Sequence, residues 1–187
     1  MRKIIRVLVI IMTVVLLISC KRAIKPSELP ANIQIGNHYY TQFALQFEKG
    51  RYVTTNYRRG VLLPINSEVT LLEITNKTIL VSVAPSHFEL LIKNAYKHTN
   101  DDTIQAFNKL FAESKRDLKQ FTKQERKQIK LGKVAKGMRK KAVLAAMGYP
   151  PQIETPSLDI DQWTYWSSRW NRFIVYFHNG RVARIQD

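Results

Sequence analysis

The sequence predicts an α+β fold, in which a small β-rich domain precedes a module of two helices and a three-stranded antiparallel sheet. Three observations lead to this prediction. Between about residues 39 and 83, β-branched and aromatic residues alternate with polar ones, which is typical of short antiparallel strands. Between residues 100 and 147, apolar residues recur at intervals of three and four, which is typical of amphipathic helices. After residue 162, strand-like runs return on either side of an Asn-Gly pair.

The N-terminus has the layout of an export signal that ends at a cysteine. Cations within residues 1–6 precede an apolar run over residues 7–17, and small Ser19 precedes Cys20. The sequence Leu17-Ile18-Ser19-Cys20 resembles the lipobox of bacterial lipoproteins, which implies a signal peptide over residues 1–19 and acylation of Cys20. The alternative is an uncleaved transmembrane anchor, but the apolar run is shorter than the about 20 residues that span a bilayer.

Cys20 is the only cysteine, so a disulfide or a cysteine-based metal site within one molecule is excluded. Several acyl chains on one residue bind a membrane far more firmly than a single chain. Residues 20–30 contain two prolines and no periodicity, which predicts a flexible tether. If the sorting rules for bacterial lipoproteins apply, Lys21 is compatible with an outer-membrane protein that faces the periplasm, although the inner membrane stays open.

The chain is strongly basic, with 30 Lys and Arg against 14 Asp and Glu and a formal net charge of +16. Its signal peptide contains three of these cations and no acid, so the remainder keeps +13. In a cytosolic protein this charge would indicate nucleic-acid binding. Behind an export signal, the available polyanions are lipid headgroups, lipopolysaccharide and the cell wall, so we expect no nucleic-acid partner. The alternative is that the charge only reflects a Lys- and Arg-rich proteome.

The β-rich domain is predicted over residues 31–99. Two stretches between residues 43 and 57 alternate in polarity, and residues 69–74 and 78–83 form a predicted hairpin. Residues 88–97 fit neither period, so they predict either a last strand or a short helix.

Residues 100–121 are predicted to form a connecting helix. Residues 100–103 supply N-cap candidates, and the apolar residues that follow recur at helical spacing. Phe107 and Phe111 belong to this apolar stripe. We assign both to the core and not to a ligand site, because an aromatic stripe at helical spacing usually packs inward.

The C-terminal module is predicted over residues 122–187. Thr122 and Glu125 form a capping box that starts a helix, and Gly137 is its expected end. A second helix is expected from Arg139 to Met147, with Gly148 after its last turn. Three strands follow, of which the last two flank a turn at His178-Asn179-Gly180. Trp163 and Tyr165 lie on one face of the first strand and are expected to pack under the helices.

Several short motifs in this module are similar to those of a known family. They are Gly137-Met138, Val143, Gly148-Tyr149-Pro150, Trp163-Thr164-Tyr165, Val175-Tyr176-Phe177 and Asn179-Gly180-Arg181-Val182. In order and spacing they resemble the SmpA/OmlA-like family of small outer-membrane lipoproteins, which includes an accessory lipoprotein of the β-barrel assembly machinery. The resemblance implies two helices packed on a three-stranded sheet. It also implies a role in outer-membrane protein assembly or envelope integrity, with a β-barrel assembly complex as partner.

The chain departs from this family in two ways. The family usually has a threonine or serine N-cap and an acid at the second helix, where this chain has Arg139-Lys140-Lys141. Cations at a helix start oppose the helix dipole, by about 0.3–1 kcal/mol each at low salt. Such a start predicts either an anion site or a solvated charged face. The second departure is the β-rich domain, which the accessory lipoprotein lacks.

The expected contacts with a partner or with anionic lipid lie on the module. They are the basic residues Arg126, Lys127, Lys130, Arg139, Lys140 and Lys141, together with the indoles of Trp166 and Trp170. We expect the two indoles to be exposed for a protein partner, with burial in the core as the alternative.

A different function remains open, namely an envelope ligand-binding lipoprotein for cell-wall glycan or peptide, or an inhibitor-like binding module. In that case Tyr52, Tyr57, Arg58 and Arg59 of the β-rich domain are the expected contacts.

The sequence contains no recognisable catalytic motif. The four histidines are scattered, and there is no His-Glu-x-x-His pair, Gly-x-Ser-x-Gly elbow or phosphate-binding glycine loop. Asp159 and Asp161 are two apart and are interpreted as turn residues, with a cation or acid/base pair as the alternative. We therefore expect no enzyme activity, no cofactor and no metal.

Overall fold

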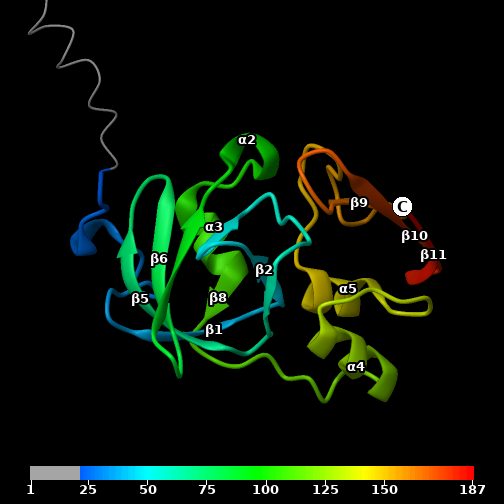
Figure 1. Ribbon diagram of the computed structural model, residues 1–187, viewed down its shortest axis with the longest axis horizontal. Coiled ribbons are helices and arrows are strands. Elements are labelled where there is room, and N and C mark those ends of the chain that lie inside the picture. The colour runs from blue at the N-terminus through cyan, green and yellow to red at the C-terminus, as the bar shows by residue number, and fades with distance from the viewer. Residues whose placement is uncertain (1–21) are drawn as a thin grey trace, which may run out of the picture.

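The computed structural model describes residues 22–187 and has mixed α and β content (Figure 1). Its described part contains a curled six-stranded sheet, two smaller sheets and four α-helices. The α+β class predicted from the sequence is therefore confirmed. The predicted signal peptide and Cys20 lie outside the described residues.

The six-stranded sheet has the strand order β3-β7-β6-β5-β1-β8. The strands β5 and β6 pair antiparallel as the predicted hairpin, whereas β3 runs parallel to β7. A separate two-stranded sheet joins β2 to β4. The bounds of these strands are β1 His38–Thr41, β2 Leu45–Phe47, β3 Arg51–Val53, β4 Val61–Leu63, β5 Glu68–Ile74, β6 Thr78–Val83, β7 Phe88–Lys93 and β8 Phe111–Ala112.

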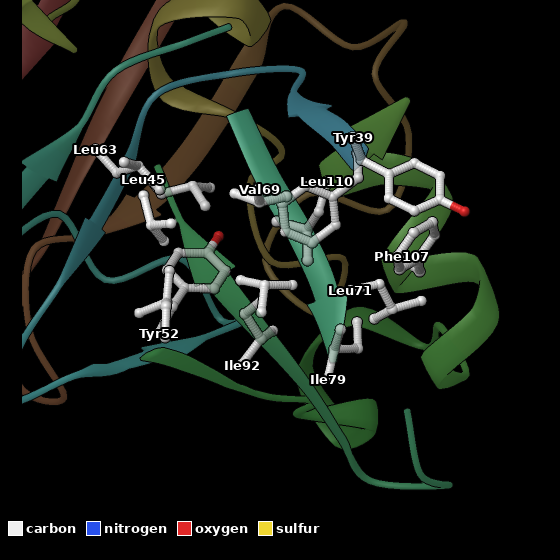
Figure 2. Packing of buried hydrophobic residues seen from close by; sticks show 14 of the residues in the cluster. Tyr39, Leu45, Tyr52, Leu63, Val69, Leu71, Ile79, Ile92, Phe107 and Leu110 are labelled. Atoms are coloured by element: carbon white, nitrogen blue, oxygen red, sulfur yellow. The ribbon is translucent and has the colours of Figure 1, made fainter. Parts of the chain in front are cut away.

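Alternating apolar residues of β5 and β6 form the first core. Leu71 and Val81 are paired across the hairpin and are fully buried. The rings of Tyr39 and Phe107 meet edge to face, with centroids 5.0 Å apart, and attach a helix to the sheet (Figure 2).

The ambiguous segment before that helix contains both predicted structures. Strand β7 ends at Lys93, and a single helical turn, α2, follows at Tyr96–Thr99. Helix α3 spans Thr103–Leu110 and is shorter than the predicted connecting helix over residues 100–121. It ends because Phe111 is extended and starts β8, which pairs with β1. The predicted core positions of Phe107 and Phe111 are confirmed, since both are buried.

Helix α4 spans Lys123–Leu131 and begins with the predicted capping box. Its predicted end at Gly137 is wrong, because the helix stops at Gly132. Gly132 adopts a φ of 62°, and the amide of Lys133 reaches back to the carbonyl of Gln128 at 3.1 Å. These bonds satisfy carbonyls that a longer helix would otherwise use.

The second predicted helix and the three predicted strands are present. Helix α5 spans Lys140–Met147, and the C-terminal sheet has the order β11-β10-β9. Trp163 and Tyr165 are fully buried in a second core that includes residues of α5, as expected. The strand bounds are β9 Gln162–Trp166, β10 Arg172–His178 and β11 Arg181–Gln186.

The predicted tether over residues 20–30 is wrong for its described part. Ala23 forms an isolated bridge with Thr75, and the amide of Ile24 donates to the carbonyl of Ile74 at 3.0 Å. A 3₁₀ turn, η1, follows at Pro26–Glu28. Ile24 also packs against the first core, so its burial and backbone bonding outweigh the lack of sequence periodicity. Within residues 22–187, no helix has the length and apolar character needed to cross a bilayer.

Candidate functional site

Arg139 was expected to face a membrane or partner, but its guanidinium forms an ion pair with Glu125. The backbone amide of Arg139, at the N-cap of α5, also donates to Glu125 Oε1 at 3.0 Å. Bonding to Arg139 holds the pKa of the buried Glu125 at about 2. A carboxylate from α4 therefore offsets the unfavourable cations at the start of α5. Arg139 is half-buried, and its contact with lipid or a partner stays a prediction.

Lys140 is also engaged within the molecule. Its Nζ donates to the carbonyl of Asp159 at 2.8 Å and lies 3.1 Å from a carboxylate oxygen of Asp161. It also lies 5.3 Å from the centroid of the Phe177 ring. Lys140 thus holds the loop before β9, and its predicted contact with lipid or a partner stays a prediction. Asp161 serves this contact, and Asp159 accepts a bond from Ser157, as turn residues do.

The other predicted basic residues remain at the surface. Lys127, Lys130 and Lys141 are exposed, while Arg126 is half-buried and donates to the carbonyl of Phe121 at 2.6 Å. The predicted anion site at the start of α5 is not open, because Arg139 and Lys140 have internal partners. Contact of the remaining lysines with lipid or protein stays a prediction.

Trp166 was expected to be exposed, and this is wrong, because only 6% of it is accessible. Its Nε1 donates to Glu154 Oε1 at 3.0 Å, and the Arg172 guanidinium lies 4.0 Å from its ring centroid. The rings of Tyr57 and His98 pack against it from the β-rich side. Trp166 therefore belongs to the junction between the two parts of the molecule.

Trp170 lies in the connection between β9 and β10 and is 79% exposed, which confirms its expected exposure. Its backbone amide donates a hydrogen bond to Ser168 Oγ at 3.2 Å. The indole is therefore held on a tight turn at the surface, where a partner could bury it.

Arg58 links the two parts of the molecule. Its Nη1 donates to the carbonyls of Ala44 at 3.0 Å and Met147 at 3.2 Å, and its Nη2 donates to the carbonyl of Gly132 at 3.0 Å. Met147 and Gly132 stand at the C-terminal ends of α5 and α4, where the helix dipole favours a cation. One arginine from the β-rich part thus stabilises both helix ends of the module.

Asn56 strengthens this junction. Asn56 is buried, and its backbone adopts a positive φ of 63°. The side-chain Nδ2 donates to the carbonyls of Met147 at 2.6 Å and Tyr149 at 3.0 Å. The amide of Arg58 donates to the carbonyl of Trp166 at 2.9 Å. Sequence reasoning missed this junction, because polar residues in a turn-like segment carry no periodic signal for burial.

The contacts predicted for a ligand-binding β-rich domain are only partly available. Tyr52 is 2% exposed, and the Arg58 side chain is bonded within the junction. The prediction that these two residues form an open ligand surface is therefore wrong. Tyr57 is half-buried. Arg59 is exposed but pairs with Glu48 at 2.8 Å.

A cavity of about 400 Å³ opens beside the junction, and we name it the junction cavity. It lies between the α2–α3 segment and residues 149–158. Its two charged residues, Asp101 and Lys109, form an ion pair with an N–O distance of 2.6 Å. Its other polar and aromatic walls include Phe43, Tyr52, Asn100, Gln105, Tyr149 and Gln152.

The described residues contain no cluster of three or more His, Cys, Asp or Glu side chains suited to a metal ion. Comparison of the chain with family models, curated proteins and solved structures found no match. The resemblance to the SmpA/OmlA-like family therefore stays a prediction.

Proposed function

We propose that this protein is a lipid-anchored bacterial envelope lipoprotein without enzyme activity, which docks on an envelope protein through its C-terminal module. In this proposal Cys20 carries the lipid and places the body on the periplasmic side of the outer membrane. The β-rich part continues beyond the predicted residue 99 through α3 and β8, and residues 122–187 form the module that the SmpA/OmlA-like resemblance implies. The role is to support outer-membrane protein assembly or envelope integrity.

The observation that carries the proposal is the direct attachment of the chain to the sheet just after Cys20. The carbonyl of Arg22 accepts a bond from the amide of Asn76 at 3.4 Å, and Ala23 bridges to Thr75. A lipid on Cys20 would therefore hold the body close to the membrane. The sheet of β9, β10 and β11 lies at the other end of the molecule from this entry (Figure 1). In this proposal the chain therefore enters at the membrane side and presents the docking module on the opposite side.

Two exposed features of the module support docking. Trp170 offers a large aromatic side chain, and buried tryptophans are common among the residues that dominate protein interfaces. Lys127, Lys130 and Lys141 supply positive charge at the surface.

Site-specific crosslinking tests the docking role. A photo-crosslinking amino acid replaces Trp170 in intact cells, and the exposed Tyr96 on the β-rich side, 60% accessible, is the control position. We expect capture of a β-barrel assembly component from position 170 and not from position 96. Capture of only cell-wall or secretion-system proteins would contradict the assembly role and leave the anchor intact.

Fractionation tests the anchor separately. We expect Cys20→Ala to leave the membrane fraction after a high-salt wash, because the acyl chains supply the membrane affinity. Retention equal to that of the wild type would contradict lipid anchoring at Cys20.

A further inference from the structure

We infer that the junction cavity binds a neutral saccharide. This inference goes beyond the docking role and does not depend on it. The volume of about 400 Å³ lies within the range of about 300–1,000 Å³ typical of small-molecule sites. The cavity lies between two parts of the fold, which is also where such sites are often found.

The charge of the cavity favours a neutral ligand. Lys109 Nζ lies 2.7 and 2.6 Å from the two carboxylate oxygens of Asp101, so the two charges compensate each other. The lining contains no other charged residue, although the chain has 30 Lys and Arg. An anionic ligand would have to compete with Asp101 for the one ammonium group available.

Amide side chains in the lining have free hydrogen-bonding capacity. Within residues 22–187, the side chains of Asn100 and Gln152 make no hydrogen bond, and Gln105 uses only its carbonyl oxygen, which accepts from the amide of Asp102 at 2.9 Å. Each primary amide offers two donors as well as an acceptor. This combination suits hydroxyl groups, which both donate and accept, better than it suits a purely anionic or cationic group.

Tyr52 supplies a phenol to the lining of the cavity. It lines the cavity with 2% of its surface exposed, and its hydroxyl makes no hydrogen bond to any described residue. Burial raises the pKa of this phenol, which keeps it neutral and able to donate. A ligand hydroxyl in the cavity would accept a hydrogen bond from this phenol.

Aromatic rings supply an apolar wall. The rings of Phe43 and Tyr149 meet edge to face with centroids 6.0 Å apart, and Lys109 Nζ lies 5.2 Å from the Tyr149 centroid. Free amides and a phenol beside these rings thus match the hydroxyl groups of a sugar.

Isothermal titration calorimetry of the full-length protein, purified from membranes in detergent, tests the inference. The probes are chitotriose, maltotriose and the neutral peptide acetyl-tetra-alanine amide. We expect saturable binding of at least one trisaccharide and none of the peptide. Preference for chitotriose would indicate an N-acetylated glycan as the source, and preference for maltotriose a glycan without acetamido groups.

Conservative variants then locate the site. Tyr52→Phe and Gln152→Ala each remove one hydrogen-bonding group, so we expect each to weaken binding about two- to tenfold. Tyr96→Phe, outside the cavity, is the matched control and should bind like the wild type. Thermal melting confirms that each variant is folded. Absence of saturable trisaccharide binding, tighter binding of the peptide, or wild-type affinity in both cavity variants would overturn the inference.

Discussion

Glu125 shows how one side chain can serve two helices. Its Oε2 accepts from the amide of Thr122 at 3.0 Å, which completes the capping box of α4. Its Oε1 accepts from the backbone amide of Arg139 at 3.0 Å, at the start of α5, and both oxygens bind the Arg139 guanidinium. The repulsion between the helix dipole of α5 and the cations at its start is therefore offset by a carboxylate 14 positions earlier in the chain.

This arrangement predicts a specific loss of stability in acid. The pKa of Glu125 is lowered from 4.5 to about 2, so its stabilising effect is complete above pH 4.5 and is lost as the pH falls toward 2. We expect Glu125→Gln to lower the free energy of unfolding at neutral pH by about 1–3 kcal/mol. Between pH 4.5 and 2 the difference between wild type and variant should shrink.

Urea unfolding at a series of pH values measures both effects. Glu113→Gln, at an exposed position, is the control and should follow the wild type. If the wild type and Glu125→Gln kept a constant difference down to pH 2, the assigned role of Glu125 would be wrong.

At the scale of elements, the ends of the helices connect the two parts of the fold. The end of α5 is fixed by Gly148, whose φ is 74° and whose amide donates to the carbonyl of Leu144 at 2.8 Å. A Cβ at this position would lie 2.9 Å from Phe43 Cζ and closer still to two other atoms of the ring. Gly148 is thus required both for its backbone conformation and for close packing on the β-rich part.

These two requirements can be separated by comparing two glycines. Gly137 also has a positive φ, of 83°, but a Cβ there would meet no atom within 4 Å. We expect Gly137→Ala to destabilise the fold by about 1–2 kcal/mol, from the backbone conformation alone. Gly148→Ala should lose about 1–3 kcal/mol more, because the buried Phe43 ring must move and because the ψ of −165° at Gly148 is reserved almost entirely to glycine. Chemical denaturation of both variants tests this, and equal losses would contradict the packing role of Gly148.

The elements themselves were largely predictable because their signals are local. The Thr122 capping box, the β5–β6 hairpin and the Asn179-Gly180 turn each depend on residues within a few positions of one another. The end of α4 was not predictable in the same way, because both Gly132 and Gly137 are suitable residues and only the tertiary structure selects Gly132. The junction depends on Asn56 and Met147, which are 91 positions apart, so no local pattern could reveal it.

The predicted partner site shows the same contrast between local signals and long-range contacts. Exposure of Trp170 was expected and is confirmed, but Trp166, four residues earlier, is buried by Tyr57 and His98 from the other part of the chain. The type of residue alone could not distinguish the two indoles.

For the whole molecule, the junction decides whether the chain behaves as one body or as two. The cores of the β-rich part and the C-terminal part are distinct clusters of buried residues. Between them lie the hydrogen bonds of Asn56 and Arg58, and the packing of Phe43 on Gly148. Both parts contribute to the junction cavity, so a ligand there and a partner on the module would act on the same rigid unit.

Limited proteolysis tests this unity. The segment over residues 113–119 contains the exposed Lys115 and Lys119, where we expect trypsin to cut first. In the wild type the two fragments should stay associated in gel filtration. Arg58→Met leaves the carbonyl of Gly132 without this donor, at a cost of about 1–3 kcal/mol if it stays buried, and leaves the carbonyl of Met147 with Asn56 alone, so the fragments should separate.

The neighbouring arginine provides the matched control. Arg59 is about half exposed and pairs with Glu48 at the surface, so Arg59→Met removes the same charge but no hydrogen bond to the helix ends of the module. Its fragments should remain together after cutting. Separation of the wild-type fragments, or equal behaviour of the two variants, would show that the junction does not join the two parts, and the anchor would then not fix the position of the docking module.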